Sequence, residues 1–235
     1  MRNFSLTYNK VAIIPIAHEN DKNIELQSYL EIVGFDVNYQ IGKKSLFDAY
    51  YSGTTDINDN DLVIMCHNDI KILSEPHFVK SIIQRTVPID NVGFIGVAGT
   101  RYLDNSGKWW NDQKSLLGSI FHGKDIENSK FKCFGPLFGC AVVLDGLFLA
   151  INGETLKKID LRKPRAFYGD WHYYDIYYTF QAHRLGFNNL VVPLQILHRS
   201  TGHFDKSWYK SRKAFQKKFK NFLPATASNN IMELP

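Results

Sequence analysis

VIMCHNDI, residues 63–70, begins as an apolar run and ends in three polar residues, His67, Asn68 and Asp69. The run is short, continuous and free of glycine and proline, so residues 61–66 are predicted to form a buried strand. Ligands of open α/β sheets bind beyond the carboxyl ends of the strands. The polar triplet is therefore expected at a ligand-binding edge, although a strand-end aspartate also commonly caps a turn or a helix.

The residues before this stretch alternate between strand and helix patterns. Strands are predicted at 10–17 and 35–41, and helices at 20–34 and 44–53. Ser45 is a plausible N-cap of the second helix, and a glycine follows or ends each helix. This alternation predicts parallel βαβ units. We expect a single α/β domain with a mostly parallel central sheet and a Rossmann-like nucleotide-binding half.

The rest of the chain is less regular. The pattern predicts helices at 75–87 and 168–187, strands at 92–99, within 115–123, within 138–152 and at 189–198, and a polar loop at 100–113. A basic helix is expected at 204–224, followed by a disordered tail. We therefore divide the chain into an α/β domain, 1–203, and a basic amphipathic helix with its tail, 204–235.

Composition restricts the class of protein. The chain has 235 residues, 44% of them hydrophobic, and a net charge of +5. This charge suits a phosphate-bearing ligand or an anionic membrane, but many basic proteins bind neither. Three cysteines without CxxC spacing predict reduced thiols in a cytoplasmic protein, at most peripheral on the inner face of a membrane. Nucleic-acid binding is not expected, because the basic residues concentrate in one terminal helix.

Acidic and histidine residues fall at the ends of several predicted elements. Asp69 follows a strand, Asp170 and Asp175 bracket the start of a helix, and His198 ends the final strand. These termini can meet on one rim of a sheet. Carboxylate and imidazole groups there would suit Mg²⁺ or Mn²⁺. Each residue taken alone is more often structural, and Asp170 resembles a helix N-cap.

The order of these motifs resembles the family 2-type glycosyltransferases with the A-type nucleotide-sugar fold, especially their short bacterial glycosyltransferase-like branch. The similarity spans about residues 10–203. The segments that carry it are VAIIPIAHEN (11–20), GKKSLFDAYYSG (42–53), DNDLVIMCHNDI (59–70), YYDIYYTFQAHRLGF (173–187) and LQILHRSTG (194–202). The third segment is similar to a strand that ends in an Asp-x-Asp-type motif, which in this branch often reads His-x-Asp.

The resemblance implies a role for each of these segments. Asp69 and His198 would bind Mn²⁺ or Mg²⁺ on the donor diphosphate, and Asp175 would be the general base of an inverting transfer. The nucleotide sugar, by default a UDP-sugar, would contact Pro15, Ile16, Ala17, His18, Lys44, Ser45, His67, Asn68, Asp69 and Asp145. The acceptor, a glycan or a lipid-linked sugar, would lie near Trp109, Trp110, Asp170 and His172. Lys44 is also consistent with a surface lysine, and the two tryptophans with anchors of a long loop.

The sequence departs from the family pattern at three positions. His67 stands in the place of the first acid of the Asp-x-Asp motif, and Tyr51 in the place of an asparagine. The usual Glu-Asp pair reads Tyr174-Asp175. Two other functions stay open, a sugar-phosphate nucleotidyltransferase and a non-catalytic carbohydrate-binding protein. The first is disfavoured because the segment after the first strand, residues 15–23, has no glycine.

The predicted C-terminal helix has an aromatic face and a basic face. Trp208, Phe215, Phe219 and Phe222 share roughly one side, and lysines and arginine occupy the others. A basic amphipathic helix of this kind is typical of a membrane-surface segment, which would suit a lipid-linked acceptor. The pattern equally fits a helix whose aromatic face packs on the domain, and we favour this second interpretation.

Overall fold

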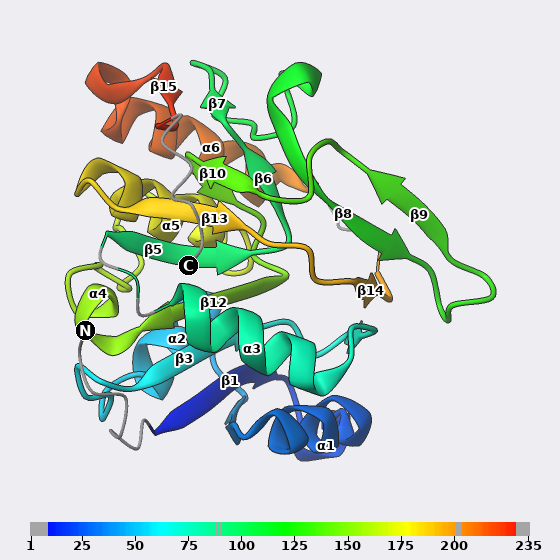
Figure 1. The fold of residues 1–235 in the computed structure, drawn as a ribbon. Coiled ribbons are helices and arrows are strands. Elements are labelled where there is room, and N and C mark those ends of the chain that lie inside the picture. Colours follow the sequence, from blue (N-terminus) through cyan, green and yellow to red (C-terminus); the bar gives the residue numbers. More distant parts are fainter. Residues whose placement is uncertain (1–8, 88, 90, 201–203, 229–235) are drawn as a thin grey trace.

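The computed structural model describes residues 9–87, 89, 91–200 and 204–228 (Figure 1). Its central sheet has seven strands in the order β10-β13-β5-β12-β3-β1-β2. These strands are β1 (Lys10–Ile16), β2 (Asp36–Ile41), β3 (Leu62–Cys66), β5 (Val92–Gly96), β10 (Gly139–Ala141), β12 (Phe148–Asn152) and β13 (Asn188–Val191). All run in one direction except β10 and β12. The α/β class and the mostly parallel sheet are therefore confirmed.

The first half of the sheet forms as the sequence predicts. Helices α1 (Ile24–Val33) and α2 (Leu46–Gly53) connect β1, β2 and β3, which pair in parallel. The Ser45 hydroxyl accepts a hydrogen bond from the Asp48 amide at 3.0 Å and caps α2. At the end of α1, Gly34 has φ 98°, a left-handed conformation that favours glycine. These local signals fix the βαβ half of the fold.

Helices cover both faces of the central sheet (Figure 1). On one face α1 packs beside α3 (Pro76–Thr86). On the other, α2 packs beside α5 (Tyr174–Arg184), with Phe47 against the ring of Tyr178 at 5.5 Å between centroids. A short helix, α4 (Gly153–Leu156), follows β12. The described residues also include three short 3₁₀ helices, η1 (Glu19–Asp21), η2 (Gln113–Ser115) and η3 (Lys220–Phe222).

A second sheet stands at the carboxyl edge of the first. Its strands follow the order β11-β6-β8-β14-β4, and β9 pairs with β8 in a hairpin that projects from the molecule (Figure 1). They are β4 (Ile70–Ile72), β6 (Ala98–Thr100), β8 (Leu116–His122), β9 (Lys130–Cys133), β11 (Val143–Leu144) and β14 (Ile196–His198). In this sheet His198 lies opposite Ile70 on one side and His122 on the other. The second sheet therefore carries His198 next to the residues that follow β3.

Three predicted strands are divided between the two sheets. Residues 92–99 form β5 and β6, residues 138–152 form β10, β11 and β12, and residues 189–198 form β13 and β14. The chain changes sheets at Val97 and around Pro193. Proline has no amide hydrogen to give to a ladder, so the last predicted strand could not continue through Pro193. Apolar periodicity alone does not reveal such a transfer between sheets.

Helix α5 begins at Tyr174, so the prediction that it starts at 168 and that Asp170 caps it was wrong. The residues before it bond to distant parts of the chain. The Gly169 amide donates to the Ser211 hydroxyl at 2.8 Å, and the Asp170 carbonyl accepts from the Leu46 amide at 2.9 Å. These bonds replace the local bonds of a helix, and Tyr173, the N-cap residue, adopts φ 67°.

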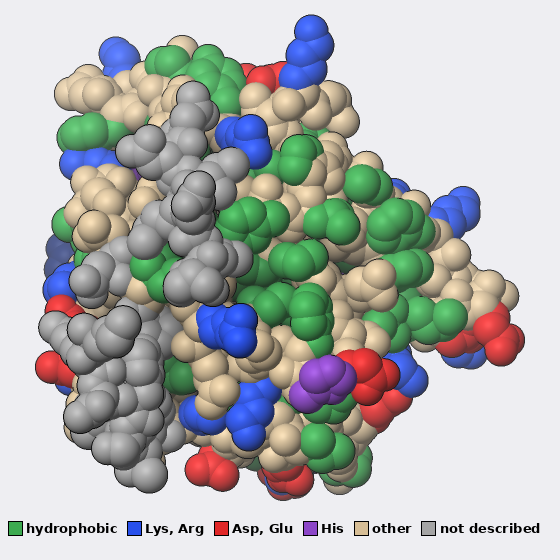
Figure 2. Space-filling view, viewed as in Figure 1, with side chains coloured by type: hydrophobic (Ala, Val, Ile, Leu, Met, Phe, Trp, Pro, Cys, Tyr) green, Lys and Arg blue, Asp and Glu red, His purple; other side chains and the backbone are tan. Residues whose placement is uncertain are grey.

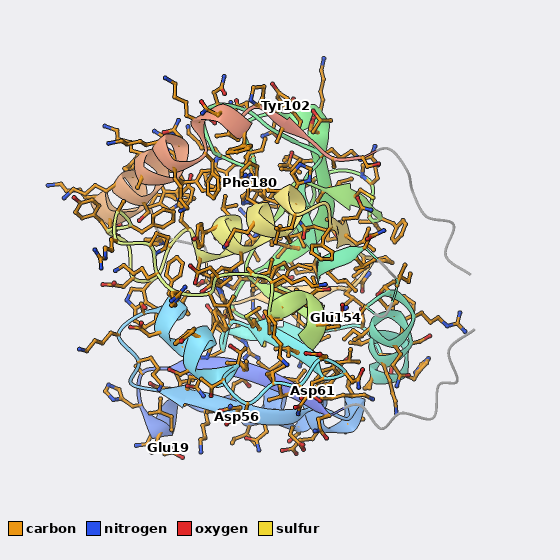
Figure 3. All side chains as sticks on the ribbon, turned by 90° about the vertical axis from the view of Figure 1, so that its left-hand side faces the viewer. Glu19, Asp56, Asp61, Tyr102, Glu154 and Phe180 are labelled. Carbon is orange, nitrogen blue, oxygen red and sulfur yellow. The ribbon has the colours of Figure 1, made fainter. Side chains whose placement is uncertain are left out.

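The aromatic face of α6 (Lys206–Lys218) packs on the domain, as we favoured. Trp208, Phe215 and Phe219 are buried, and the ring of Phe215 lies 5.3 Å from that of Phe180. Figure 3 labels Phe180 beside α6. Phe222 is the exception, because it is exposed and lies under the Arg184 guanidinium at 3.3 Å. Within the described part of the chain, no helix has the length and apolar character to cross a membrane.

The chain after α6 forms a strand. β15 (Ala225–Thr226) pairs antiparallel with β7 (Tyr102–Leu103), and the Ala227 amide donates to the Arg101 carbonyl at 2.8 Å. The prediction of a disordered tail was therefore wrong for residues 225–228. Its remaining part, residues 229–235, lies outside the described residues.

Candidate active site

Three side chains from two strand ends form a group that suits a metal ion. His67 and Asp69 follow β3, His198 ends β14, and one ligand atom of each lies within 4.8 Å of the others. Asp69 is central, with Oδ2 at 3.4 Å from His198 Nε2 and Oδ1 at 3.8 Å from His67 Nδ1. The side chain of Asp69 is 42% exposed and that of His198 11%, so a ligand can reach the group from the aspartate side.

The charges of the group depend on one another. Burial would raise the pKa of the Asp69 carboxyl, but hydrogen bonding to His198 and the charges of His198 and His67 outweigh burial and hold it well below its ordinary value. Burial and the neighbouring His198 lower the pKa of His67, against the opposite effect of Asp69. A metal ion would bind the ionised carboxylate, and it would displace a proton from any imidazole nitrogen that it binds.

Tyr174 orients the imidazole ring of His67. The Tyr174 hydroxyl donates its one hydrogen to the Gly146 carbonyl at 3.0 Å, and His67 Nε2 lies 2.7 Å from the same hydroxyl oxygen. The tyrosine hydroxyl therefore bridges the Gly146 carbonyl and the imidazole and orients the ring of His67. The other ring nitrogen, Nδ1, faces Asp69.

Asp175, the predicted base, follows Tyr174 in the first turn of α5. Its Oδ2 accepts a hydrogen bond from the Gly146 amide at 3.1 Å. Burial, and then the charge of nearby Asp145, raise the pKa of Asp175 from 3.8 to about 7, against the lowering effect of backbone hydrogen bonds. A carboxylate whose pKa is raised in this way accepts a proton more readily than an ordinary carboxylate.

Gly146 connects Asp175, through Tyr174, to the His67–Asp69–His198 group. Its carbonyl accepts from Tyr174, and its amide donates to Asp175. A Cβ atom at this position would lie 2.1 Å from the Tyr174 hydroxyl oxygen and 2.8 Å from Asp175 Cβ. Only glycine lets both neighbours approach so closely.

The residues predicted for the nucleotide lie around the ends of β1 and β2. Pro15 and Ile16 close β1, and Ala17 and His18 after them are exposed. Lys44 is exposed, whereas Ser45 is buried with its hydroxyl engaged in capping α2. The exposed residues of this group offer polar and apolar surface beside the metal-binding edge.

Asn68 and Asp145 hold loops around the same edge. Asn68 Nδ2 donates to the Asp21 carbonyl at 2.7 Å, and its Oδ1 accepts from the Asn23 amide at 3.3 Å. It therefore joins the end of β3 to the β1–α1 connection. Asp145 Oδ1 accepts from the Leu147 amide at 3.1 Å, which orders the turn around Gly146.

The two tryptophans anchor the 100–113 loop. Trp109 is buried against Phe134 at 5.7 Å between ring centroids, and Trp110 stacks on Trp208 of α6 at 5.6 Å. These contacts support the loop-anchor interpretation. Trp110 also contacts Phe204, which is exposed. The tryptophan cluster of Trp109, Trp110 and Trp208 therefore borders the surface.

Asp170 and His172 lie in the segment before α5. Asp170 forms an ion pair with Lys163, and His172 Nε2 lies 3.5 Å from Asp205 Oδ1. Asp205 is the N-cap of α6. His172 therefore links the start of α6 to the segment that leads into Asp175.

Sequence reasoning missed Tyr174 as part of the site. It associated Gly146 only with the donor sugar, through the resemblance, and it left open whether His67 contacts the ribose, a metal or neither. Tyr174 was noticed only as a departure from an acidic pattern. That departure was the available signal, since a hydroxyl at an acid's position can still form a hydrogen bond with an imidazole. His122 was also missed, and its ring lies 5.6 Å from that of His198.

Fold and site together define an α/β protein of the GT-A kind. The solved structure of GalNAc-T7 with UDP, GalNAc and Mn²⁺ is similar, with a TM-score of 0.51 and 11% identity, over 90% of this chain and 48% of that one. This chain thus spans about half the length of that relative, and the likeness is one of fold. A197 from STIV aligns at a TM-score of 0.44 and 14% identity, over 85% of this chain and 87% of that one. UDP-glucose pyrophosphorylase in complex with UDP-glucose aligns at a TM-score of 0.37 and 12% identity, over 89% of this chain and 81% of that one.

The family is given by the sequence itself. The profile of a family described as "Glycosyltransferase like family" matches residues 22–222, and the chain belongs to this family. None of the curated proteins matches the sequence. The family assignment agrees with the fold likeness.

Proposed function

We propose that the protein transfers a sugar from a nucleotide-diphospho-sugar to a hydroxyl group of a glycan or lipid-linked acceptor, with inversion at the anomeric carbon. A UDP-sugar is the first donor to test. One observation carries the proposal: the His67–Asp69–His198 group and the high-pKa carboxyl of Asp175 are joined through Tyr174 and Gly146.

The residues present fit a divalent cation. Two imidazole nitrogens and one carboxylate oxygen come within 4.8 Å of one another, and the exposed side of Asp69 leaves room for further oxygen ligands. Imidazole suits transition metals better than Mg²⁺, which prefers oxygen, so this set favours Mn²⁺. When bound, the cation supplies positive charge that neutralises the diphosphate of the donor.

Asp175 is the proposed base. It takes the proton of the acceptor hydroxyl while that oxygen bonds to the anomeric carbon and the bond from this carbon to the diphosphate oxygen breaks. The Gly146 amide holds Oδ2, which keeps the carboxylate oriented and leaves Oδ1 for the incoming proton. With a pKa of about 7, Asp175 is a stronger base than an ordinary carboxylate and is still ionised in a large fraction of molecules at neutral pH.

We assign the contacts to the nucleotide, the donor sugar and the acceptor from where the remaining residues lie in the fold. Residues 15–18 and Lys44 would face the nucleotide, and Asp145 the donor sugar. Asp170, His172 and the border of the tryptophan cluster would face the acceptor. The Ser200 hydroxyl lies 3.0 Å from His198 Nε2, the nitrogen that faces Asp69, so this hydroxyl would have to turn away for the nitrogen to bind a metal ion.

The test is binding of nucleotides and nucleotide sugars followed by thermal shift, with Mn²⁺ and with EDTA. We expect one donor to raise the melting temperature only with the metal, and Asp69→Asn to lose this effect. Asp56→Asn, which changes an exposed aspartate, is the matched control and should behave as wild type. Asp175→Asn should still bind the donor but transfer no sugar.

Other outcomes would contradict the proposal. If nucleotide were incorporated from a nucleoside triphosphate and a sugar 1-phosphate, the protein would be a nucleotidyltransferase. If no donor bound and Asp69→Asn changed nothing, a non-catalytic carbohydrate-binding protein would be favoured.

A further inference from the structure

The outer face of α6 carries a stripe of lysines. Lys206, Lys210, Lys213 and Lys217 are exposed and follow one another at intervals of four, three and four residues. This spacing places them on one side of the helix, over about 16 Å at 1.5 Å per residue. Figure 3 shows nitrogen-tipped side chains extending outward around α6.

These lysines have no acidic neighbours on their own helix. Residues 206–222 contain no aspartate or glutamate, and none of the ion pairs among the described residues includes a lysine of α6. Like charges three and four residues apart destabilise a helix. By contrast, lysine and arginine are scattered over the face that carries α3 (Figure 2).

An open groove runs beside the stripe. Its volume is about 740 Å³, and it lies between α6 and the 164–168 segment. Five of its lining side chains are cations, Arg165, Lys210, Lys213, Lys217 and Lys218, and none is acidic. Pro164, Ala166, Phe167 and Ala214 make up the apolar part of its lining. A groove of this composition suits a group that is anionic at one end and apolar at the other.

Exposed aromatic residues border the same surface. Tyr168 is 65% exposed with Lys210 Nζ 5.0 Å from its ring centroid, and Tyr209 is 49% exposed. Phe204 and Trp171 near the start of α6 are exposed as well. Aromatic side chains with lysines beside them are typical of segments that lie at a membrane–water interface. A soluble polyanion would need the lysines but not these rings.

We propose that this surface, formed by the lysine stripe, the groove and the aromatic residues around them, docks on a membrane that contains anionic phospholipids. The lysines and Arg165 contact the phosphate groups, and Tyr168 and Tyr209 lie at the interface. The buried aromatic face of α6 takes no part, since Trp208, Phe215 and Phe219 belong to the core.

Docking in this way would present the acceptor side of the site to the membrane. Asp205, which caps the start of α6, contacts His172, and Trp208 contacts Trp110. A lipid-linked acceptor would then reach Asp175 from the bilayer surface. This last step rests on the proposed function, whereas docking itself does not.

The test is sedimentation of the full-length protein with vesicles of phosphatidylcholine, alone or mixed with phosphatidylglycerol. We expect binding only to the mixed vesicles, and less of it at high salt. Lys213→Glu/Lys217→Glu should bind at least about 30-fold more weakly, since each lysine near an anionic surface contributes about a factor of five. Lys124→Glu/Lys130→Glu alters two exposed lysines around the β8–β9 hairpin by the same total charge and should bind as wild type.

Two further measurements make the result decisive. Tyr168→Ala, which changes no charge, should lower vesicle binding several-fold, and thermal melts should show all variants folded. Sugar transfer to a water-soluble acceptor should be unchanged in the α6 variant, so loss of docking is distinguishable from loss of catalysis. The proposal is overturned if wild type does not sediment with the mixed vesicles, if both double variants lose binding equally, or if soluble polyphosphate binds the protein while vesicles do not.

Discussion

Replacing Asp175 by asparagine should make the protein more stable while it abolishes sugar transfer. The pKa of Asp175 is raised from 3.8 to about 7 by burial and by Asp145. The folded protein therefore holds this proton more tightly than the unfolded chain does. The stability that the protonated Asp175 side chain contributes is fully present below pH 3.8 and is lost as the pH rises through about 7. Asparagine keeps the oxygen that accepts from Gly146 and never ionises.

The size of the effect follows from the two pKa values. At 1.36 kcal/mol per pH unit, the ionised Asp175 costs the folded state about 4 kcal/mol above pH 7. This figure is an upper limit, because the side chain of Asp175 keeps partial contact with solvent. Of this cost, about 2 to 3 kcal/mol develops between pH 5 and pH 8.

Urea unfolding of wild type and Asp175→Asn at pH 5 and pH 8 measures this directly. The free energy of unfolding of the variant should exceed that of wild type by a margin that grows with pH. Asp56→Asn, an exposed aspartate, should show no such growth. A margin that is independent of pH, or a variant less stable than wild type at pH 8, would refute the reasoning about Asp175.

Three further changes test neighbouring parts of the structure. Asp145→Asn should lower the pKa of Asp175, so the pH-dependent loss of stability in urea titrations should be smaller and should end at a lower pH than in wild type; an unchanged profile would contradict the role of Asp145. Tyr174→Phe should weaken Mn²⁺ binding about 10- to 100-fold by calorimetry, because His67 loses its orienting partner, whereas Tyr178→Phe on the same helix should not. Phe215→Ala should reduce the free energy of unfolding by about 3 to 5 kcal/mol, and a loss below about 1 kcal/mol would mean that α6 is not part of the core.

The βαβ half of the fold, from β1 to β3, could be predicted because its signals are local. Its apolar strands, the Ser45 cap and the terminal glycine of α1 each act within a few residues. The start of α5 could not be found in this way. Asp170 and Gly169 bond to Leu46 and Ser211, far away in the sequence, and local pattern favours a helix that these bonds prevent.

In the candidate site, too, some residues could be predicted from local sequence and others depend on contacts between distant parts of the chain. Asp69, Asp175 and His198 could be singled out because each stands at the end of a predicted element. Tyr174 could not be paired with His67, because 107 residues separate them and the contact exists only once β3 and α5 are packed. The high pKa of Asp175 likewise depends on a neighbour, Asp145, that only the folded chain supplies.

The short ladder between β15 and β7 has a practical consequence for handling the protein. β15 covers one edge of β7, just before the loop that carries the tryptophans. A chain cut before Pro224 would leave this edge with unpaired amide and carbonyl groups, and such edges recruit strands from other molecules. Shortening the protein at this end therefore risks self-association, even though every residue of the candidate active site would remain.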